Sequence, residues 1–329
     1  MDSNVAVEAV DLVKRFGDNA AVDGVSFAVP AGTVLGMLGP NGAGKTTTVR
    51  MLTTLSRPTS GTGMVAGYDI IRQPEMVRRS MGLTGQAATV DELLTARENL
   101  RMVGGLSGMP RATIRPAADD LLERFLLTDA ADRIVKTYSG GMRRRLDLAV
   151  SLIAAPPVLF LDEPTTGLDP RSRNDLWDVL RGLVREGTTL LLTTQYLEEA
   201  DQLADDIVVI DKGHVIAHGT PTDLKSQAGR ASVVLTVTHS CDLRRAEELM
   251  RRCVEEVHLE VGARRLTAQA SGLADMSRIG EVFAASGIAV DDLGLQRPSL
   301  DDVFLHLTGH RAEDEPDSTS DVQLEGALG

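Results

Sequence analysis

An octapeptide near the N-terminus has the residue types and spacing of a phosphate-binding loop. Its sequence is Gly39-Pro40-Asn41-Gly42-Ala43-Gly44-Lys45-Thr46, which matches G-x-x-x-x-G-K-[ST] at every fixed position. Glycines let successive backbone N–H groups point at phosphate oxygens, and a helix that starts near the lysine adds the positive end of its dipole. We expect Lys45 to neutralise the β- and γ-phosphates of ATP and to act in catalysis, and Thr46 to ligate Mg²⁺. The next residue, Thr47, completes the predicted loop contact with the nucleotide.

Two adjacent carboxylates form the second candidate site. Asp162 and Glu163 follow four apolar residues, 158–161, which have the composition of a buried strand. Such a strand delivers both carboxylates at its end, where Asp162 can hold Mg²⁺ through its hydration shell and Glu163 can polarise the attacking water. Two acids before a proline also occur in ordinary surface turns. The phosphate-binding loop favours the catalytic interpretation.

The elements that must position these residues alternate between strands and helices. Apolar runs at 33–38, 158–161, 189–193 and 207–210 predict buried strands, separated by helical sequence, and this order is typical of an α/β fold with a mostly parallel sheet. The segments 5–7 and 25–29 predict a further β part at the N-terminus. Thr95 and Glu98 have the spacing of a capping box. They lie in a segment, about residues 89–150, that we interpret as a helical subdomain inserted into the core.

A second unit is predicted after the turn signal at residues 221–223. The order of its predicted elements between residues 226 and 309 is β-α-β-β-α-β, which indicates a small α+β, ferredoxin-like fold. The last residues, 310–329, are rich in acids and have no apolar period. We expect them to form a disordered acidic tail.

A third motif resembles a hallmark of one family of P-loop ATPases. Residues 138–142, Tyr-Ser-Gly-Gly-Met, are similar to the signature loop of the ATP-binding-cassette (ABC) family, usually Leu-Ser-Gly-Gly-Gln. Ser139 and the amides of Gly140 and Gly141 can form an anion-binding nest at a helix start. The resemblance implies that this nest binds the γ-phosphate of ATP held by the opposite subunit, so that hydrolysis requires a homodimer of ATPase subunits. Met142 removes a polar side chain but leaves the nest intact.

Further residues between 5 and 222 resemble other parts of the same family. Phe16 resembles the aromatic residue that stacks on adenine, with a core aromatic as the alternative. Gln86 resembles the glutamine that coordinates Mg²⁺ and senses the transport partner. Asp169, in Gly-Leu-Asp at 167–169, resembles the aspartate that communicates across the dimer. The resemblance therefore implies an ABC ATPase domain of the P-loop NTPase fold over residues 5–222, with the α+β accessory domain after it.

One residue departs from the family pattern. The family usually has a histidine after the last core strand, where it contacts the γ-phosphate, and Gln195 stands in that place. A glutamine amide can donate a hydrogen bond to phosphate and accept one from water, but it cannot take up a proton near neutral pH. Our hypothesis is that Gln195 positions water and phosphate while Glu163 acts as the base.

The C-terminal residues narrow the resemblance to one branch. Residues 297–305, Arg-Pro-Ser-Leu-Asp-Asp-Val-Phe-Leu, and the Thr-Thr-Gln-Tyr at 193–196 are similar to the daunorubicin/doxorubicin-resistance type of ABC ATPase, a drug-export branch. The apolar spacing over 300–307 also predicts an amphipathic helix that packs on its own domain. The branch implies a separate ABC permease as the membrane subunit, a hydrophobic small molecule as the transported substrate, and a role in antibiotic resistance.

Composition limits partners and location. The formal net charge of −13 argues against a nucleic-acid partner. The chain has no apolar stretch of about 20 residues and no signal sequence, and its two cysteines are expected to be reduced thiols. We therefore expect a peripheral protein on the cytoplasmic face of the cell membrane.

Two alternatives belong to other functional classes. The first is an ABC ATPase that acts in translation rather than transport, and the second is a regulatory module that binds nucleotide without hydrolysis. A single phosphate-binding loop and the acidic charge oppose the first, and the intact Lys45, Asp162 and Glu163 oppose the second.

Overall fold

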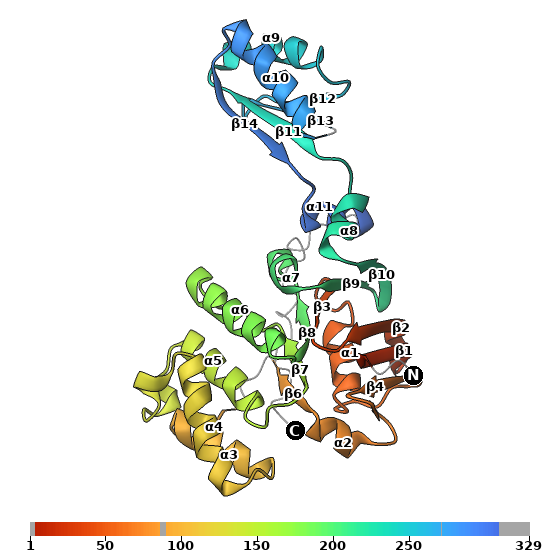
Figure 1. Cartoon of the computed structure of the whole chain (residues 1–329). Coiled ribbons are helices and arrows are strands. Elements are labelled where there is room, and N and C mark those ends of the chain that lie inside the picture. The colour runs from red at the N-terminus through yellow and green to blue at the C-terminus, as the bar shows by residue number, and fades with distance from the viewer. Residues whose placement is uncertain (1–3, 86–89, 271, 309–329) are drawn as a thin grey trace, which may run out of the picture. The chain divides into compact units, whose positions relative to one another are not determined.

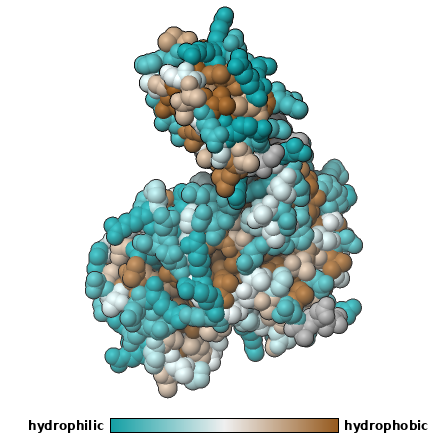
Figure 2. Space-filling view, turned by 45° about the horizontal axis from the view of Figure 1, so that its top comes forward, coloured by the Kyte–Doolittle hydropathy of each residue, from teal (hydrophilic) through white to brown (hydrophobic). Residues whose placement is uncertain are grey.

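The chain folds into two compact units, which the computed structural model describes over residues 4–85, 90–270 and 272–308 (Figure 1). The first unit extends to Pro221 and the second begins at Thr222. The predicted acidic tail at 310–329 and Gln86 lie outside the described residues. No helix within these ranges is both long and apolar enough to cross a membrane. Figure 2 shows a mostly hydrophilic face on which hydrophobic residues are dispersed, as is usual for protein surfaces.

A six-stranded sheet forms the centre of the first unit. Its strand order is β10 (His214–Gly219), β9 (Asp206–Asp211), β3 (Val34–Leu38), β8 (Thr189–Thr194), β7 (Val158–Asp162) and β6 (Met81–Thr84). The strands from β9 to β6 are parallel, and β10 is antiparallel to β9. In the register, Leu38 pairs with Thr194 and Asp162 with Thr193. The carboxyl ends of β3, β7 and β8 therefore meet at one edge of the sheet.

Both faces of this sheet are covered, so every residue of β3, β7 and β8 is buried. Alternate residues point to opposite faces. Phe160 and Leu191 belong to a core with helix α1 (Lys45–Leu52) and the antiparallel sheet. Leu159 and Leu190 belong to a core with α5 (Gly140–Ser151) and α6 (Pro170–Arg185).

The antiparallel sheet packs on the opposite side of α1. Its strand order is β2 (Asn19–Pro30), β1 (Val5–Phe16), β4 (Ser60–Val65) and β5 (Tyr68–Asp69). Two further helices complete the first unit: α2 (Pro74–Arg79) leads from β5 of the antiparallel sheet to β6, and α7 (Leu197–Leu203) leads from β8 to β9. The predicted α/β fold with a parallel sheet and an antiparallel β part is confirmed.

Helices between β6 and β7 form the inserted helical part. They are α3 (Ala96–Leu106), α4 (Arg111–Arg124), the short 3₁₀ turns η1 (Thr128–Ala130) and η2 (Val135–Thr137), and α5. The predicted capping box is present, because Glu98 N donates to Thr95 Oγ1 at 3.2 Å and Thr95 N donates to Glu98 Oε2 at 2.8 Å. It starts α3 at a defined residue.

The second unit has the predicted β-α-β-β-α-β order. Its elements are α8 (Pro221–Gln227), β11 (Ser232–Val237), η3 (Ser240–Asp242), α9 (Leu243–Met250), β12 (Val257–Glu260), β13 (Arg265–Gln269), α10 (Leu273–Ser286), β14 (Val290–Gln296) and α11 (Leu300–Thr308). The sheet order β12-β13-β11-β14 is antiparallel throughout. Alternate residues of β11, such as Leu235, pack with Ile279 and Phe283 of α10. This arrangement is ferredoxin-like.

Candidate functional site

The phosphate-binding loop lies between β3 and α1, as its motif predicts. At Gly39 an added Cβ would lie 2.2 Å from Ile210 O, and at Gly44, where φ is +108°, it would lie 2.5 Å from Ala21 O. A side chain at either position would collide with backbone, so the loop requires glycine there. Gly44 is the N-cap of α1 and gives it no side-chain cap. The first N–H groups of α1 are therefore available to an anion.

The side chain of Lys45 is buried against the backbone of this loop. Its Nζ donates to Gly39 O at 2.6 Å and to Pro40 O at 3.0 Å, and only 4% of the residue is exposed. Burial lowers the pKa of Lys45, while Glu163 and Asp162 act to raise it. The carbonyls of Gly39 and Pro40 give this desolvated ammonium only partial negative charges. A phosphate would give it a full negative charge.

Thr46 and Asp162 form an oxygen-rich pair at the edge of the sheet. Asp162 Oδ1 accepts from Thr46 Oγ1 at 3.1 Å and from Thr193 Oγ1 at 2.5 Å, and Asp162 is 5% exposed. Hydroxyl and carboxylate oxygens suit Mg²⁺, which in nucleotide sites takes few protein ligands and completes its shell with phosphates and water. These two side chains fit the predicted ion.

Glu163 is brought next to the phosphate-binding loop. It lines one cavity of about 170 Å³ together with loop residues 40–47. Its φ of +50° is uncommon for a residue with a side chain, and such strain is frequent at active sites. The conformation is held by hydrogen bonds from Glu163 N to Thr193 O at 3.0 Å and to Thr193 Oγ1 at 3.2 Å.

Gln195 and Phe16 lie at the ends of strands of the first unit. Gln195 is half-buried and follows Thr194, the register partner of Leu38 at the base of the loop. Phe16 ends β1 and is 57% exposed, so the alternative of a core aromatic is wrong. The ammonium of Lys14 lies 5.0 Å from the centroid of the Phe16 ring. Stacking of adenine on this ring remains a prediction.

The signature loop begins α5. Ser139 is the N-cap, and its Oγ accepts from Met142 N at 3.2 Å. Ser139 and Gly140 are exposed, and none of residues 139–141 lines the cavity of the phosphate-binding loop. Ser139 and Gly140 are therefore accessible from outside the chain, and their binding of an anion remains a prediction.

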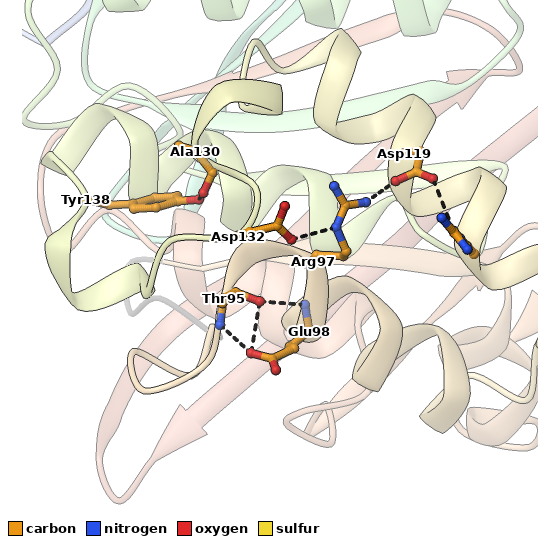
Figure 3. A network of polar contacts seen from close by, with 8 residues as sticks. Thr95, Arg97, Glu98, Asp119, Ala130, Asp132 and Tyr138 are labelled. Carbon is orange, nitrogen blue, oxygen red and sulfur yellow. Dashed lines mark hydrogen bonds and ion pairs between the residues drawn. The ribbon is translucent and has the colours of Figure 1, made fainter.

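A polar network holds the approach to this loop (Figure 3). The buried Tyr138 donates from its hydroxyl to Ala130 O at 2.6 Å. Arg97 of α3 is bonded to Asp119 of α4 and to Asp132, the latter at 2.8 Å from Nε to Oδ1. The Arg97 contacts join α3 to α4 and to Asp132, in the segment that leads towards Ser139 (Figure 3).

Asp169, singled out by the resemblance, is the N-cap of α6, where its Oδ1 accepts from Ser172 N at 3.0 Å, and its hydrogen bonds with Ser172 hold the pKa of its carboxyl below the ordinary range. The contacts of two other residues escaped the sequence analysis. Thr193 supports both carboxylate residues, but its place in the Thr-Thr-Gln-Tyr pattern gave no sign of that role. Arg144 of α5 donates to four backbone carbonyls around the carboxylates. It lies within a run of three arginines that gave no signal.

Comparisons with known proteins agree with this geometry. Residues 22–166 match the family model described as ABC transporter. A daunorubicin resistance ATP-binding protein of Streptomyces coeruleorubidus is 52% identical over 310 residues, which cover 94% of this chain and 96% of that protein. A Nod factor export ATP-binding protein of Ralstonia nicotianae is 42% identical, with 92% of this chain and 94% of that protein covered.

The fold has solved counterparts as well. A structure described as the ATP binding subunit of an ABC transporter superposes with a TM-score of 0.62 at 29% identity, and covers 68% of this chain and 92% of that one.

Proposed function

The chain belongs to the family of ABC transporter ATP-binding subunits, and from this premise we propose that its ATP hydrolysis drives export of a hydrophobic drug through a separate membrane subunit. It is an ATPase of the ABC type. The proposal concerns the roles of individual residues, the partners and the substrate. Residues 5–222 would act as the ATPase domain, and residues 226–309 as an accessory domain.

The observation that carries the catalytic part is the cavity shared by the phosphate-binding loop and Glu163. Loop amides, Lys45 and the start of α1 would hold the ATP phosphates. Thr46 and Asp162 would hold Mg²⁺, which supplies charge neutralisation on the β- and γ-phosphates when bound. Gln86, by resemblance, would join them.

Glu163 is the group proposed to accept the proton of the attacking water. A general base must reach that proton at hydrogen-bond distance, and Glu163 borders the space beside the loop in which the γ-phosphate would end. Gln195 would donate to the γ-phosphate and accept from the water, without taking up a proton. Phe16 would stack on adenine.

The exposed signature loop supports the proposed homodimer. Ser139, Gly140 and Gly141 lie at an exposed helix start that does not line their own chain's nucleotide cavity. In a dimer they would close over the γ-phosphate bound by the partner, so each site would be complete only when two subunits associate. Binding of ATP would close the dimer and hydrolysis would reopen it.

A groove on the first unit is the proposed seat of the membrane subunit. Its volume is about 920 Å³, and it is lined by residues of α2, β6, α3 and α5, including Arg78, Arg79 and Leu106. Leu106 is 81% exposed and lines this groove, where an apolar side chain could pack against a partner. The permease would bind here and place the chain on the cytoplasmic face of the membrane.

The drug substrate is proposed from the relatives. The protein named for daunorubicin resistance is 52% identical to this chain, and the one named for Nod factor export is 42% identical. A hydrophobic drug is therefore favoured over a Nod factor as the substrate. Selectivity would belong to the membrane subunit, since that subunit forms the path of the substrate.

Export from cells tests the proposal. The chain is produced together with the membrane protein that co-purifies with it, in drug-sensitive bacteria, and the efflux of fluorescent daunorubicin is measured. We expect efflux that is lost in Glu163→Gln. Efflux equal to that of cells without the chain would refute the drug-export proposal, and a ribosomal protein as the sole co-purifying partner would favour a translation ATPase.

A further inference from the structure

Arg144 makes an unusual set of contacts for a residue that does not line the nucleotide cavity. Its Nε donates to Pro164 O at 2.8 Å and its Nη1 to Gly85 O at 2.7 Å. Its Nη2 donates to Asp162 O at 3.2 Å and to Glu163 O at 2.9 Å. The side chain is only 12% exposed. One guanidinium therefore satisfies four backbone carbonyls from two segments of the chain.

These carbonyls surround the reacting groups. Three belong to the consecutive residues 162–164, which carry the candidate metal ligand and the candidate base. The fourth belongs to Gly85, which immediately precedes Gln86. The planar guanidinium presents its five N–H donors in a fixed fork, which allows it to join segments in a way that the compact lysine ammonium cannot.

The hydrogen bond from Arg144 to Glu163 O stabilises an uncommon backbone conformation of Glu163. A residue with a side chain and a φ of +50° persists only where its surroundings hold it there. Thr193 holds the amide of Glu163, and Arg144 holds its carbonyl. Burial lowers the pKa of Arg144, which Asp147, at 3.7 Å from Nη1, acts to raise. Arginine nonetheless keeps its charge in proteins, so all its donors stay available.

The position of Arg144 on α5 connects this clamp to the other nucleotide site. The same helix starts at Ser139, whose nest would bind the ATP of the partner subunit. Because α5 is a continuous helix over residues 140–151, any shift of its N-terminus when the partner's ATP binds would also displace the base of the Arg144 side chain. The guanidinium would carry that shift to residues 162–164 and to Gly85.

We infer that Arg144 is a positioning residue for hydrolysis, which holds the backbone of Glu163 in its reactive conformation and couples it to the signature loop of the same chain. The inference rests on the proposed role of Glu163 as the base. Arg144 does not line the cavity shared by the phosphate-binding loop and Glu163, so its proposed role is to position Glu163 rather than to react. Through Arg144, binding of the partner's ATP at the signature loop would place Glu163 for hydrolysis of the ATP bound by the same chain.

The test compares Arg144→Gln and Arg144→Lys in the full chain with Arg181→Gln as the matched control. Arg181 also donates to a backbone carbonyl, Gln202 O at 3.2 Å, but lies on α6 away from the carboxylates. The ATPase kcat, KM and Hill coefficient are measured, together with the affinity for a fluorescent ATP analogue and the Tm. Arg144→Gln should lower kcat by about tenfold or more with KM changed less than about threefold, as expected for loss of positioning. Its Hill coefficient should fall towards 1.

Each outcome decides the inference. An intermediate kcat in Arg144→Lys and an unchanged Arg181→Gln support it. An unchanged kcat in Arg144→Gln overturns it. It is also overturned if ATP affinity and Tm fall together with kcat in both Arg144→Gln and Arg144→Lys, because Arg144 would then only stabilise the fold. Should Arg144→Gln not fold, Arg144→Lys decides by the same criteria, and failure of both to fold also overturns the inference. Glu163→Gln is measured beside them: full activity there refutes the proposed base, whereas loss there with retention in Arg144→Gln refutes only the clamp.

Discussion

Thr46 and Asp162 lie 116 residues apart in the chain, and a 3.1 Å hydrogen bond joins Oγ1 of the first to Oδ1 of the second. The two side chains come from the start of α1 and the end of β7. The phosphate-binding loop and the strand that ends in a carboxylate thus meet at one point of the fold. This arrangement is the structural basis for assigning Mg²⁺ to the site.

Substitution of Thr46 tests the metal assignment. Thr46→Val keeps the shape of the side chain but removes the hydroxyl, so we expect Mg²⁺ to strengthen ATP binding in the natural chain and much less in the variant. The loss should be about tenfold, the equivalent of about 1.4 kcal/mol for one ligand. ATP affinity is measured with Mg²⁺ and with EDTA, and Thr53→Val, at the far end of α1 and outside the loop cavity, serves as the control. An equal effect of Mg²⁺ in Thr46→Val and the natural chain would refute the assignment.

Gln195 leads to a prediction about pH. Its amide does not titrate near neutral pH, so in the natural chain Gln195 should cause no inflection in the pH profile of the ATPase kcat. Gln195→His should introduce one near the ordinary histidine pKa of about 6.5, while Gln195→Ala should lower kcat at every pH. The pH profile of kcat is the measurement. Normal hydrolysis in both variants would show that Gln195 has no catalytic role.

Glu199 of α7 predicts a pH-dependent change in stability. It is fully buried, and its Oε1 accepts from Trp177 Nε1 at 3.4 Å. Burial raises the pKa of Glu199, and the hydrogen bonds with Thr194, Thr165 and Trp177 oppose this only in part. An acid with a raised pKa in the folded state favours folding at low pH. That contribution is lost as the pH rises above the unfolded value of about 4.5.

Glu199→Gln should remove this dependence, because the amide can still accept from Trp177 and carries no charge. The Tm of the variant minus that of the natural chain should therefore increase from pH 5 to pH 8. Unfolding can be followed by the emission of Trp177, the single tryptophan of the chain. A difference in Tm that stays constant over this range would contradict the prediction.

Leu106 tests the proposed seat of the membrane subunit. Leu106→Glu should weaken co-purification with the membrane protein without changing ATP affinity, because a charge in the groove must be desolvated when the partner binds. Leu126→Glu is the control, since Leu126 is 68% exposed and does not line the groove. Retention of the membrane protein by Leu106→Glu, at the level of the control, would place the partner elsewhere.

Local patterns were sufficient to predict the phosphate-binding loop, the capping box at Thr95 and the order of strands and helices along the second unit. Each of these features depends on residues close together in the sequence. The loop depends on the conformational freedom of its glycines, the capping box on the spacing of Thr95 and Glu98, and the second unit on the periodicity of its apolar residues. Arg144 could not be predicted, because its partner Gly85 lies 59 residues away and only the folded chain brings them together. Glu199 stands in sequence beside the exposed Glu198, and nothing in that pattern separates them.

Pro116 lies inside α4, although proline is unfavourable in a helix interior. It is the sixth residue of that helix, where one missing N–H is offset by packing of Ile114 and Ala118 against the helical part. Tertiary contacts here outweigh a local preference.

The ATP turnover of the purified full chain, compared between the natural sequence and Glu163→Gln, tests the central claim most directly. The claim is that Glu163, held beside the phosphate-binding loop, is the base for hydrolysis in a dimer closed by ATP. It predicts that Glu163→Gln binds ATP with near-normal affinity, loses at least about a hundredfold in kcat, and accumulates as an ATP-bound dimer. Equal turnover in the two proteins, with the variant monomeric in ATP, would contradict it.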